Sequence, residues 1–212
     1  MSPRPFLLWF TLSLLAAGCN RYSRRVPDDV LKRLPYESRI ELLEAENELA
    51  LAIDHLDEAK AEVSRTRDGL RRAKDRLGAA KNEVGEAEDD VSRDVAELAV
   101  LEAESRVAFL RARQVVNVKK EAIQELALRC AHARFEVARV NVARKAKVEG
   151  AEGLSTEEFE SQAKSCEEAV AEKKTALKEE LEEEKAAKST WDKDKRELAK
   201  KTFDARASPY VE

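Results

Sequence analysis

The sequence predicts an all-α protein: an elongated coiled coil in which one very long helix, residues 36–148, is followed by an antiparallel returning helix, residues 155–206. Three observations predict this fold. Apolar residues recur every seven residues at nine successive positions, 39% of the 212 residues are charged while only 5% are aromatic, and the chain holds only six glycines and five prolines. Such a composition is typical of long helices rather than of a compact domain.

The seven-residue repeat runs through the first half of the chain. A large apolar residue marks each step, and a smaller residue, most often alanine, follows three positions later. The large residues are Leu42, Leu49, Leu56, Val63, Leu70, Leu77, Val84, Val91 and Leu98. Because a lone helix would leave this stripe in water, we expect residues 36–96 to self-associate, to pair with another protein or to fold back as a third helix.

Two features could perturb the predicted long helix. A step of four from Ser105 to Phe109 is a stutter, which locally unwinds a supercoil. Three glycines also occur, but the repeat keeps its phase across them and no proline intervenes, which favours a continuous helix. The alternative is a three-helix antiparallel bundle with a turn near residues 85–90. The glycines are Gly69, Gly78 and Gly85.

The clearest break after the N-terminal region lies at residues 149–153, where paired glycines indicate a turn. Ser155 suits the N-cap of the next helix, Glu158 completes a capping box, and Leu154 and Phe159 are placed for a hydrophobic staple. Because the tip of a helical hairpin is exposed, we expect it to contact a partner. The residues expected there are Gly150, Gly153, Leu154 and Ser155.

Opposite charge blocks predict how the two helices of this hairpin pair. Residues 106–147 are mostly basic and residues 152–184 mostly acidic. Antiparallel pairing about the turn places Lys119 and Lys120 beside Glu183 and Glu184. Exposed ion pairs contribute only about 0–1 kcal/mol each, so their main effect is on the choice of direction and partner.

Two cysteines lie on the predicted seams. In the predicted register Cys130 faces Lys173, about 10 Å along the axis from Cys166, which is too far for a disulfide. Buried, unbridged cysteines are therefore the favoured interpretation. An intrachain bridge is the alternative, since an exported protein meets oxidising conditions, and it would shift the register.

The first nineteen residues have the pattern of an export signal. Arg4 precedes an apolar run, residues 6–15, which is followed by Ala16, Ala17, Gly18 and Cys19. This run is too short to remain as a membrane-spanning helix. The segment resembles the signal of bacterial lipoproteins, with its lipobox. The resemblance implies cleavage between Gly18 and Cys19 and lipid on Cys19, and Asn20 at the second mature position implies the outer membrane.

The chain therefore divides into five predicted parts. They are a signal peptide (1–18), a lipidated tether (19–35), an N-terminal coiled-coil extension (36–96), an antiparallel helical hairpin (97–206) and a tail (207–212). Arginines at 21, 24 and 25 are placed to contact anionic headgroups, and a solvated linker is the alternative for this segment.

No pattern in the sequence indicates catalysis. His55 and His132 are isolated, and neither begins a metal-binding spacing. Phosphate-binding, dinucleotide-binding and nucleophile-elbow motifs are absent from the sequence. The net charge of −4 gives no general case for nucleic acid. We therefore expect no enzyme, no cofactor, no metal, no small-molecule substrate and no nucleic-acid partner.

The predicted function is that of an outer-membrane-anchored periplasmic coiled-coil lipoprotein, acting as a structural spacer, scaffold or adaptor. Its predicted partners are the membrane, through lipid on Cys19, and either further copies of itself or another coiled-coil protein. The alternative is a helical holdase chaperone for envelope proteins, which requires exposed apolar surface.

Overall fold

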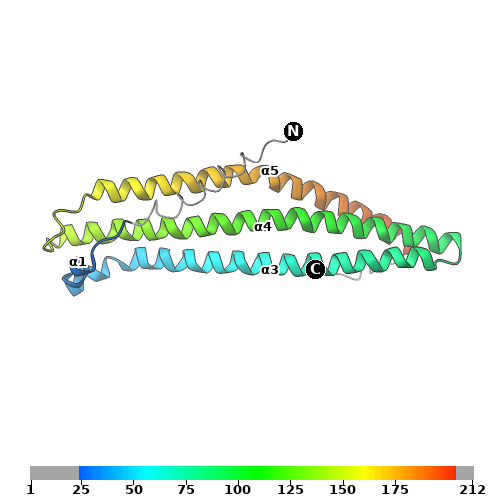
Figure 1. The fold of residues 1–212 in the computed structure, drawn as a ribbon, viewed down its shortest axis with the longest axis horizontal. Coiled ribbons are helices and arrows are strands. Elements are labelled where there is room, and N and C mark those ends of the chain that lie inside the picture. Colours follow the sequence, from blue (N-terminus) through cyan, green and yellow to red (C-terminus); the bar gives the residue numbers. More distant parts are fainter. Residues whose placement is uncertain (1–23, 204–212) are drawn as a thin grey trace, which may run out of the picture. The chain divides into compact units, whose positions relative to one another are not determined.

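The computed structural model describes residues 24–203. Over this range the chain forms helices and no strands, which confirms the all-α prediction. The helices are α1 (Asp28–Lys32), α2 (Tyr36–Ile40), α3 (Leu43–Glu86), α4 (Asp90–Lys145) and α5 (Thr156–Thr202). Figure 1 shows α3, α4 and α5 following one another along the chain with a reversal of direction at each connection.

The prediction of one continuous helix over residues 36–148 is wrong, and the three-helix alternative with a turn near residues 85–90 is confirmed. The chain leaves α3 at Glu86 and starts α4 at Asp90. Asp89 and Ser92 cap the new helix: Ser92 N donates to Asp89 Oδ1 at 2.7 Å, and Asp89 N donates to Ser92 Oγ at 3.3 Å. The bond from Ser92 N, followed by a bond from the Ser92 side chain, lowers the pKa of the Asp89 carboxyl.

Continuity of the heptad across this turn is coincidental. Val91 is in phase with the repeat, yet 68% of it is exposed. Earlier members of the repeat do face a core, with Leu42, Leu56, Val63 and Leu70 all buried. Of the three partners considered for residues 36–96, the structure therefore shows the third, in which this stretch folds back on α4.

The chain divides into two compact units. The first contains the described residues up to Leu56 together with Gln124–Glu172, and the second contains Asp57–Ile123 together with Lys173 onward. In each unit a stretch of α3, one of α4 and one of α5 lie together, and each unit has its own buried cluster.

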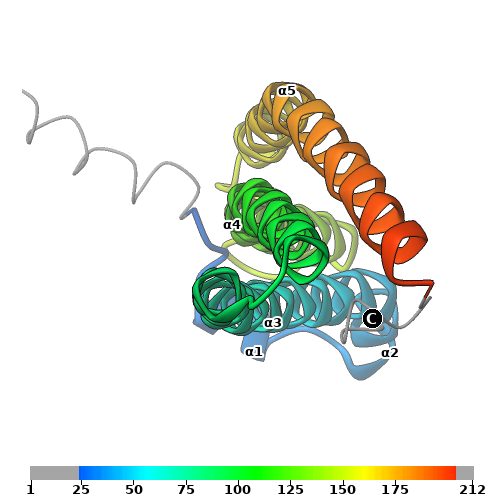
Figure 2. The ribbon, with the colours of Figure 1, turned by 90° about the vertical axis from the view of Figure 1, so that its right-hand side faces the viewer.

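In the first unit the buried cluster joins five parts of the chain. These are the segment before α3, the start of α3, the end of α4, the α4–α5 turn (residues 146–155) and the start of α5. Figures 1 and 2 show α1 and α2 beside the N-terminal end of α3. The buried members are Val26, Val30, Leu34, Leu42, Phe135, Val140, Val142, Ala143, Val148, Ala151 and Phe159.

A disulfide joins Cys130 of α4 to Cys166 of α5 in this unit, with their Cα atoms 5.4 Å apart. The favoured prediction of unbridged cysteines is therefore wrong, and so is the register that placed Cys130 opposite Lys173. The physical reason is the connection: residues 146–155 fold as successive turns, with Ala151 N bonded to Val148 O and Leu154 N to Ala151 O. The predicted register assumed that residues equidistant from the turn face each other. An irregular connection of successive turns does not keep that symmetry, so the register shifted.

In the second unit, helices α3, α4 and α5 meet at a cluster formed by Leu70, Ala73, Val107, Phe109, Leu110 and Trp191. A smaller cluster of Ala80, Ala99 and Leu198 lies nearer the α3–α4 turn. The direction of α5 relative to α4 is antiparallel as predicted, but Lys119 pairs with Glu180 rather than with Glu183. The charge blocks thus predicted the direction correctly and the register incorrectly.

Candidate functional site

The segment just before α3 is packed onto the first unit. Val26, Val30 and Leu34 are only 2%, 2% and 5% exposed. Pro27 is the N-cap residue of α1, and Pro35 that of α2, so one short helix presents Val30 to the core between two proline-fixed bends. The described part of the predicted tether is therefore not a solvated linker. We call residues 24–34 the docked segment.

Polar contacts hold the docked segment at both ends. Val26 N donates to Glu136 Oε2 at 2.7 Å, and the same carboxylate accepts from Arg139 Nη1 through its other oxygen at 2.8 Å. Arg33 Nη1 lies 3.0 Å from Glu149 Oε2 in the α4–α5 turn. Glu136 is 7% exposed, so its bond to Val26 is the strongest of these contacts, since hydrogen bonds to buried charged groups contribute about 1.5–3 kcal/mol.

Arg24 adds a contact to α5. Its guanidinium pairs with the Glu158 carboxylate and lies 5.9 Å from the centre of the Phe159 ring. Both side chains of the ion pair are about half exposed, so the pair contributes little to stability. Headgroup contact and a solvated linker were the two alternatives for Arg24 from the sequence; in the structure Arg24 pairs with Glu158 of α5.

The α4–α5 turn begins with a left-handed residue. Val148 N donates to Ala143 O at 3.0 Å, the bond that closes a Schellman motif, and Lys147 between them has φ +53°. Glycine usually occupies this position because a side chain there is strained. Gly150 also has positive φ, +88°, and a Cβ atom on it would lie 3.5 Å from Val30 Cγ2 of the docked segment.

Replacing Lys147 with glycine is expected to raise the free energy of unfolding by about 1 kcal/mol, because the left-handed conformation then carries no Cβ penalty. The measurement is urea unfolding followed by circular dichroism. His132→Gly, at an exposed position inside α4, is the control and should lower stability by about 0.5 kcal/mol. A loss of stability in the Lys147→Gly variant would contradict the assigned turn geometry.

The start of α5 follows the predicted capping pattern in part. Ser155 Oγ accepts a bond from Glu158 N at 3.3 Å, as expected of an N-cap. The Glu158 side chain pairs with Arg24 instead of with the cap backbone. Ser155 also donates to Glu157 Oε2 at 3.0 Å. This bond, after the backbone N–H of Glu157 itself, lowers the pKa of the Glu157 carboxyl.

Removing the cap by Ser155→Ala is expected to lower the free energy of unfolding by about 1 kcal/mol, because one backbone N–H of the first turn loses its acceptor. Thermal and urea unfolding measure the effect. Ser161→Ala, at an exposed position in the interior of α5, should change stability by less than about 0.5 kcal/mol. Equal effects of the two substitutions would remove the case for a cap at Ser155.

The structure places the predicted contact residues on the α4–α5 turn, but the docked segment covers part of that turn. Val148 and Ala151 are buried, and Leu154 packs against the same cluster. A Cβ atom on Gly153 would meet no atom within 4 Å, so this position of the turn is open. The predicted processing and lipidation residues, Gly18 and Cys19, lie outside the described residues.

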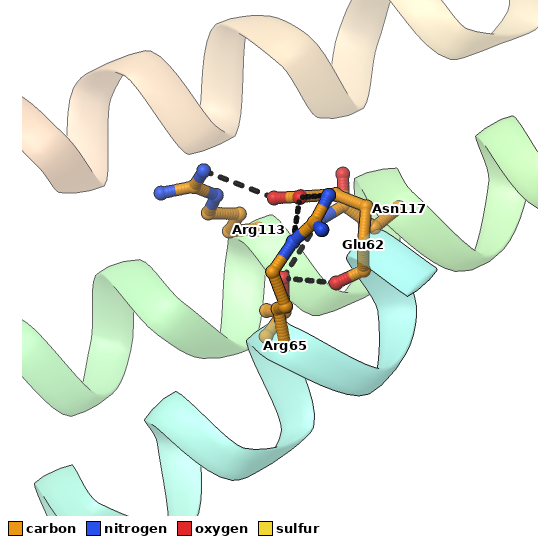
Figure 3. Close-up of polar contacts among 5 residues, drawn as sticks. Glu62, Arg65, Arg113 and Asn117 are labelled. Carbon is orange, nitrogen blue, oxygen red and sulfur yellow. Dashed lines mark hydrogen bonds and ion pairs between the residues drawn. The ribbon is translucent and has the colours of Figure 1, made fainter. Parts of the chain in front are cut away.

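A second polar site lies in the second unit, between α3 and α4 (Figure 3). Glu62 accepts from Arg65 Nε at 2.9 Å and from Arg113 Nη2 at 3.1 Å. One turn on, Asn117 Nδ2 donates to Thr66 Oγ1 at 2.8 Å, and both of these residues are 4% exposed. A buried polar pair between two helices is satisfied only in one register, so this layer aligns α3 with α4.

The charges in this layer predict a pH effect. The hydrogen bond from Arg65, with the charges of Arg113 and Arg65, lowers the pKa of the Glu62 carboxyl from its ordinary value of 4.5. A lowered pKa in the folded state stabilises the fold above pH 4.5 and loses this contribution as pH falls through the lowered value. We expect acid to destabilise Glu62→Gln less than the native chain.

Carboxyl-carbon NMR titration and urea midpoints at neutral and acid pH test this expectation. Glu58→Gln, at an exposed position on the same helix, should keep the native pH dependence. Titration of Glu62 at or above 4.5 would contradict the assigned ion pairs.

The second unit also carries a groove of about 530 Å³ beside the α3–α4 turn. Val95, Ala96, Ala99 and Leu198 line it, together with Arg76 and Glu83, which pair with each other at 3.0 Å. Among residues 24–203 no group of three or more His, Cys, Asp or Glu side chains could hold a metal ion. Over the same range, no helix combines the length and apolarity needed to cross a bilayer.

Comparison of the chain with protein-family models, curated proteins and solved structures finds no match. Function is therefore argued from the sites themselves.

Proposed function

We propose that the chain is an outer-membrane lipoprotein that holds helical hairpins in the periplasm as a spacer, scaffold or adaptor. The observation that carries this proposal is the docked segment. Val26 comes seven residues after the cysteine that the lipobox assigns to the lipid, and it is bonded to the buried Glu136. A lipid on Cys19 thus holds a folded helical unit, rather than a loose chain, at the bilayer.

Two further features support the proposal. The Cys130–Cys166 disulfide fits an oxidising compartment such as the periplasm. The polar layer at Thr66 and Asn117 aligns α3 with α4 in one register, and a defined helix register suits a spacer or scaffold. The charged side chains of these sites pair one helix with another, as Lys119 of α4 does with Glu180 of α5 and Arg113 of α4 with Glu62 of α3.

Lipidation is tested on protein from membrane fractions. Mass spectrometry of the N-terminal peptide is expected to show diacylglycerol and an acyl chain on Cys19, and Cys19→Ser should lose both and leave the membrane. Cys130→Ser/Cys166→Ser is the matched control, since it removes the other cysteines and should remain acylated. An unmodified Cys19 in the native chain would refute the anchor.

The outer-membrane localisation is tested by Asn20→Asp. If the resemblance to lipoproteins of the Gram-negative envelope holds, this substitution moves the protein from the outer to the inner membrane on a density gradient. Asn20→Ser is expected to stay in the outer membrane. Identical distributions of native and Asn20→Asp proteins would refute the outer-membrane address.

The scaffold role predicts a protein partner. A photo-crosslinking side chain placed at the open Gly153 is expected to capture a specific partner in intact cells, whereas the same side chain at the exposed Glu168 of α5 should not. The holdase alternative has less support, because the apolar stripes it would use are largely packed in the cores of the two units. If the chain suppressed light scattering from an aggregating, unfolding protein, the holdase alternative would be favoured.

A further inference from the structure

The stretch from α2 into the first turn of α3 is apolar both toward the core and toward solvent. Leu42 is buried in the core of the first unit, with Ala45 and Leu49 packed behind it. Tyr36, Ile40 and Leu43 are 76%, 57% and 52% exposed. Tyr36 and Ile40 are one turn apart on the same face of α2, and Leu43 is exposed in the first turn of α3, where Ala45 and Leu49 pack on the core instead. We call Tyr36, Ile40 and Leu43 the outer patch.

The outer patch is densest at the beginning of this stretch, and Leu51 of α3, 56% exposed, is the next exposed large apolar residue after it. Asn47 and Asp54, which continue the same face along α3, are exposed and polar. An ordinary surface helix keeps its outward face polar, so three large apolar residues in succession on that face need an explanation. The patch follows the docked segment directly, since Tyr36 comes two residues after the buried Leu34.

The lipid anchor restricts what this patch can meet. Val26 is seven residue steps after Cys19, and a chain of that length spans at most about 25 Å on any path. Val26 is fixed to Glu136 and shares the core of the first unit with Leu34 and Leu42. A bilayer that holds lipid on Cys19 therefore lies close to the part of the first unit that carries the outer patch.

We propose that the outer patch is a second membrane contact, in which Tyr36, Ile40 and Leu43 insert into the boundary between headgroups and acyl chains. This inference rests on the lipid anchor of the proposed function. Tyrosine with aliphatic neighbours suits that boundary, because the ring is apolar and its hydroxyl remains hydrated. Exposed charges of both signs surround the patch, Arg39 as well as Glu37 and Glu44, so the patch has no net positive charge that would make attraction to anionic lipid the main force. Binding through the patch is therefore insensitive to salt.

The experiment supplies the anchor chemically. Because Cys130 and Cys166 are bridged, Cys19 is the free thiol among the three cysteines of the chain. In the mature chain, residues 19–212, this thiol adds across the double bond of a maleimide-headgroup lipid and forms a thioether. The vesicles are phosphatidylcholine with brominated acyl chains, which quench tryptophan fluorescence on contact. Trp191, the one native tryptophan in the mature chain, is 3% exposed and gives a constant background.

Tyr36→Trp is expected to lose about half or more of its added fluorescence on brominated vesicles, at low salt and at about 0.5 M salt alike. Glu168→Trp, exposed on α5 in the same unit, is the matched control and should lose none. Circular dichroism confirms that both variants are folded. An absence of quenching in Tyr36→Trp, or equal quenching in both variants, overturns the proposal.

A different result would show that the outer patch binds a second copy of the chain instead of a membrane. If the uncoupled mature chain forms a dimer in analytical ultracentrifugation, and Ile40→Ser abolishes it while Val115→Ser, at an exposed position on α4, does not, the outer patch binds a second copy and the membrane proposal is overturned. Because the anchor here is attached chemically, none of these results depends on acylation in cells. Mass spectrometry of Cys19 decides that question separately.

Discussion

Replacing Trp191 with alanine is expected to lower the free energy of unfolding of the second unit by about 3–5 kcal/mol. Trp191 is 3% exposed and stacks on Phe109 with ring centres 5.3 Å apart. Its Nε1 donates to Glu102 Oε1 at 2.7 Å, and Glu102 is itself 4% exposed. The substitution therefore leaves a cavity among three helices and also a buried carboxylate without this donor.

Urea unfolding followed by circular dichroism measures this loss. Trp191→Phe separates the two causes, because it keeps an aromatic ring against Phe109 and removes only the bond to Glu102; its expected cost is about 1–3 kcal/mol. A change below about 1 kcal/mol for Trp191→Ala would contradict the packing described for the second unit.

The second large effect concerns the disulfide. Cys130 and Cys166 are 36 residues apart, and closing a loop of that length restricts the unfolded chain by an entropy worth about 4 kcal/mol. We therefore expect Cys130→Ala/Cys166→Ala to lower the free energy of unfolding by about 2–4 kcal/mol. Reduction of the native chain should produce a similar loss in urea unfolding.

Cys19→Ala is the control for this comparison, because it removes a cysteine that lies outside the loop, and it should leave stability unchanged. A thiol count on denatured, unreduced mature protein is expected to find only Cys19. Three reactive thiols, or a double variant as stable as the native chain, would contradict the bridge.

The heptad pattern predicted which residues of α3 are buried, because the same stripe satisfies any helical neighbour. Leu56, Val63 and Leu70 of α3 face a core as the pattern indicates, and so does Leu42 just before it. What the pattern could not predict is the neighbour's identity, since a Leu/Ala stripe fits a second copy, another protein or the chain itself. The turn at residues 87–89 did leave a local signal in Asp89 and Ser92, which cap each other across one turn.

Register was harder to predict than direction. Long charged side chains on exposed faces reach several partners at similar free energy, so Lys119 pairs with Glu180 as readily as with a residue one turn later. Short buried contacts allow no such freedom. The bond between Thr66 and Asn117 and the Cys130–Cys166 bridge each fix one alignment, but neither partner can be identified from one sequence without a register to start from.

The docked segment was missed because two prolines and three nearby arginines are typical of a linker. Its signal was the spacing of Val26, Val30 and Leu34, four residues apart each time, which puts three apolar side chains on one side of a short helical stretch. Glu136 gave a further hint, as one of the few acids in a basic block. Burial of that carboxylate depends on an amide 110 residues away in the sequence, which local patterns do not reveal.

Exchange of the Val26 amide hydrogen tests the central claim most directly, namely that the residues behind the anchor cysteine are part of the folded first unit. In the mature chain this amide is bonded to the buried Glu136, so we expect its exchange to be slowed at least about a hundredfold. Glu136→Ala should abolish that protection, whereas Glu125→Ala, at an exposed position on α4, should preserve it. Exchange of the Val26 amide at the rate of an unstructured peptide would contradict the account.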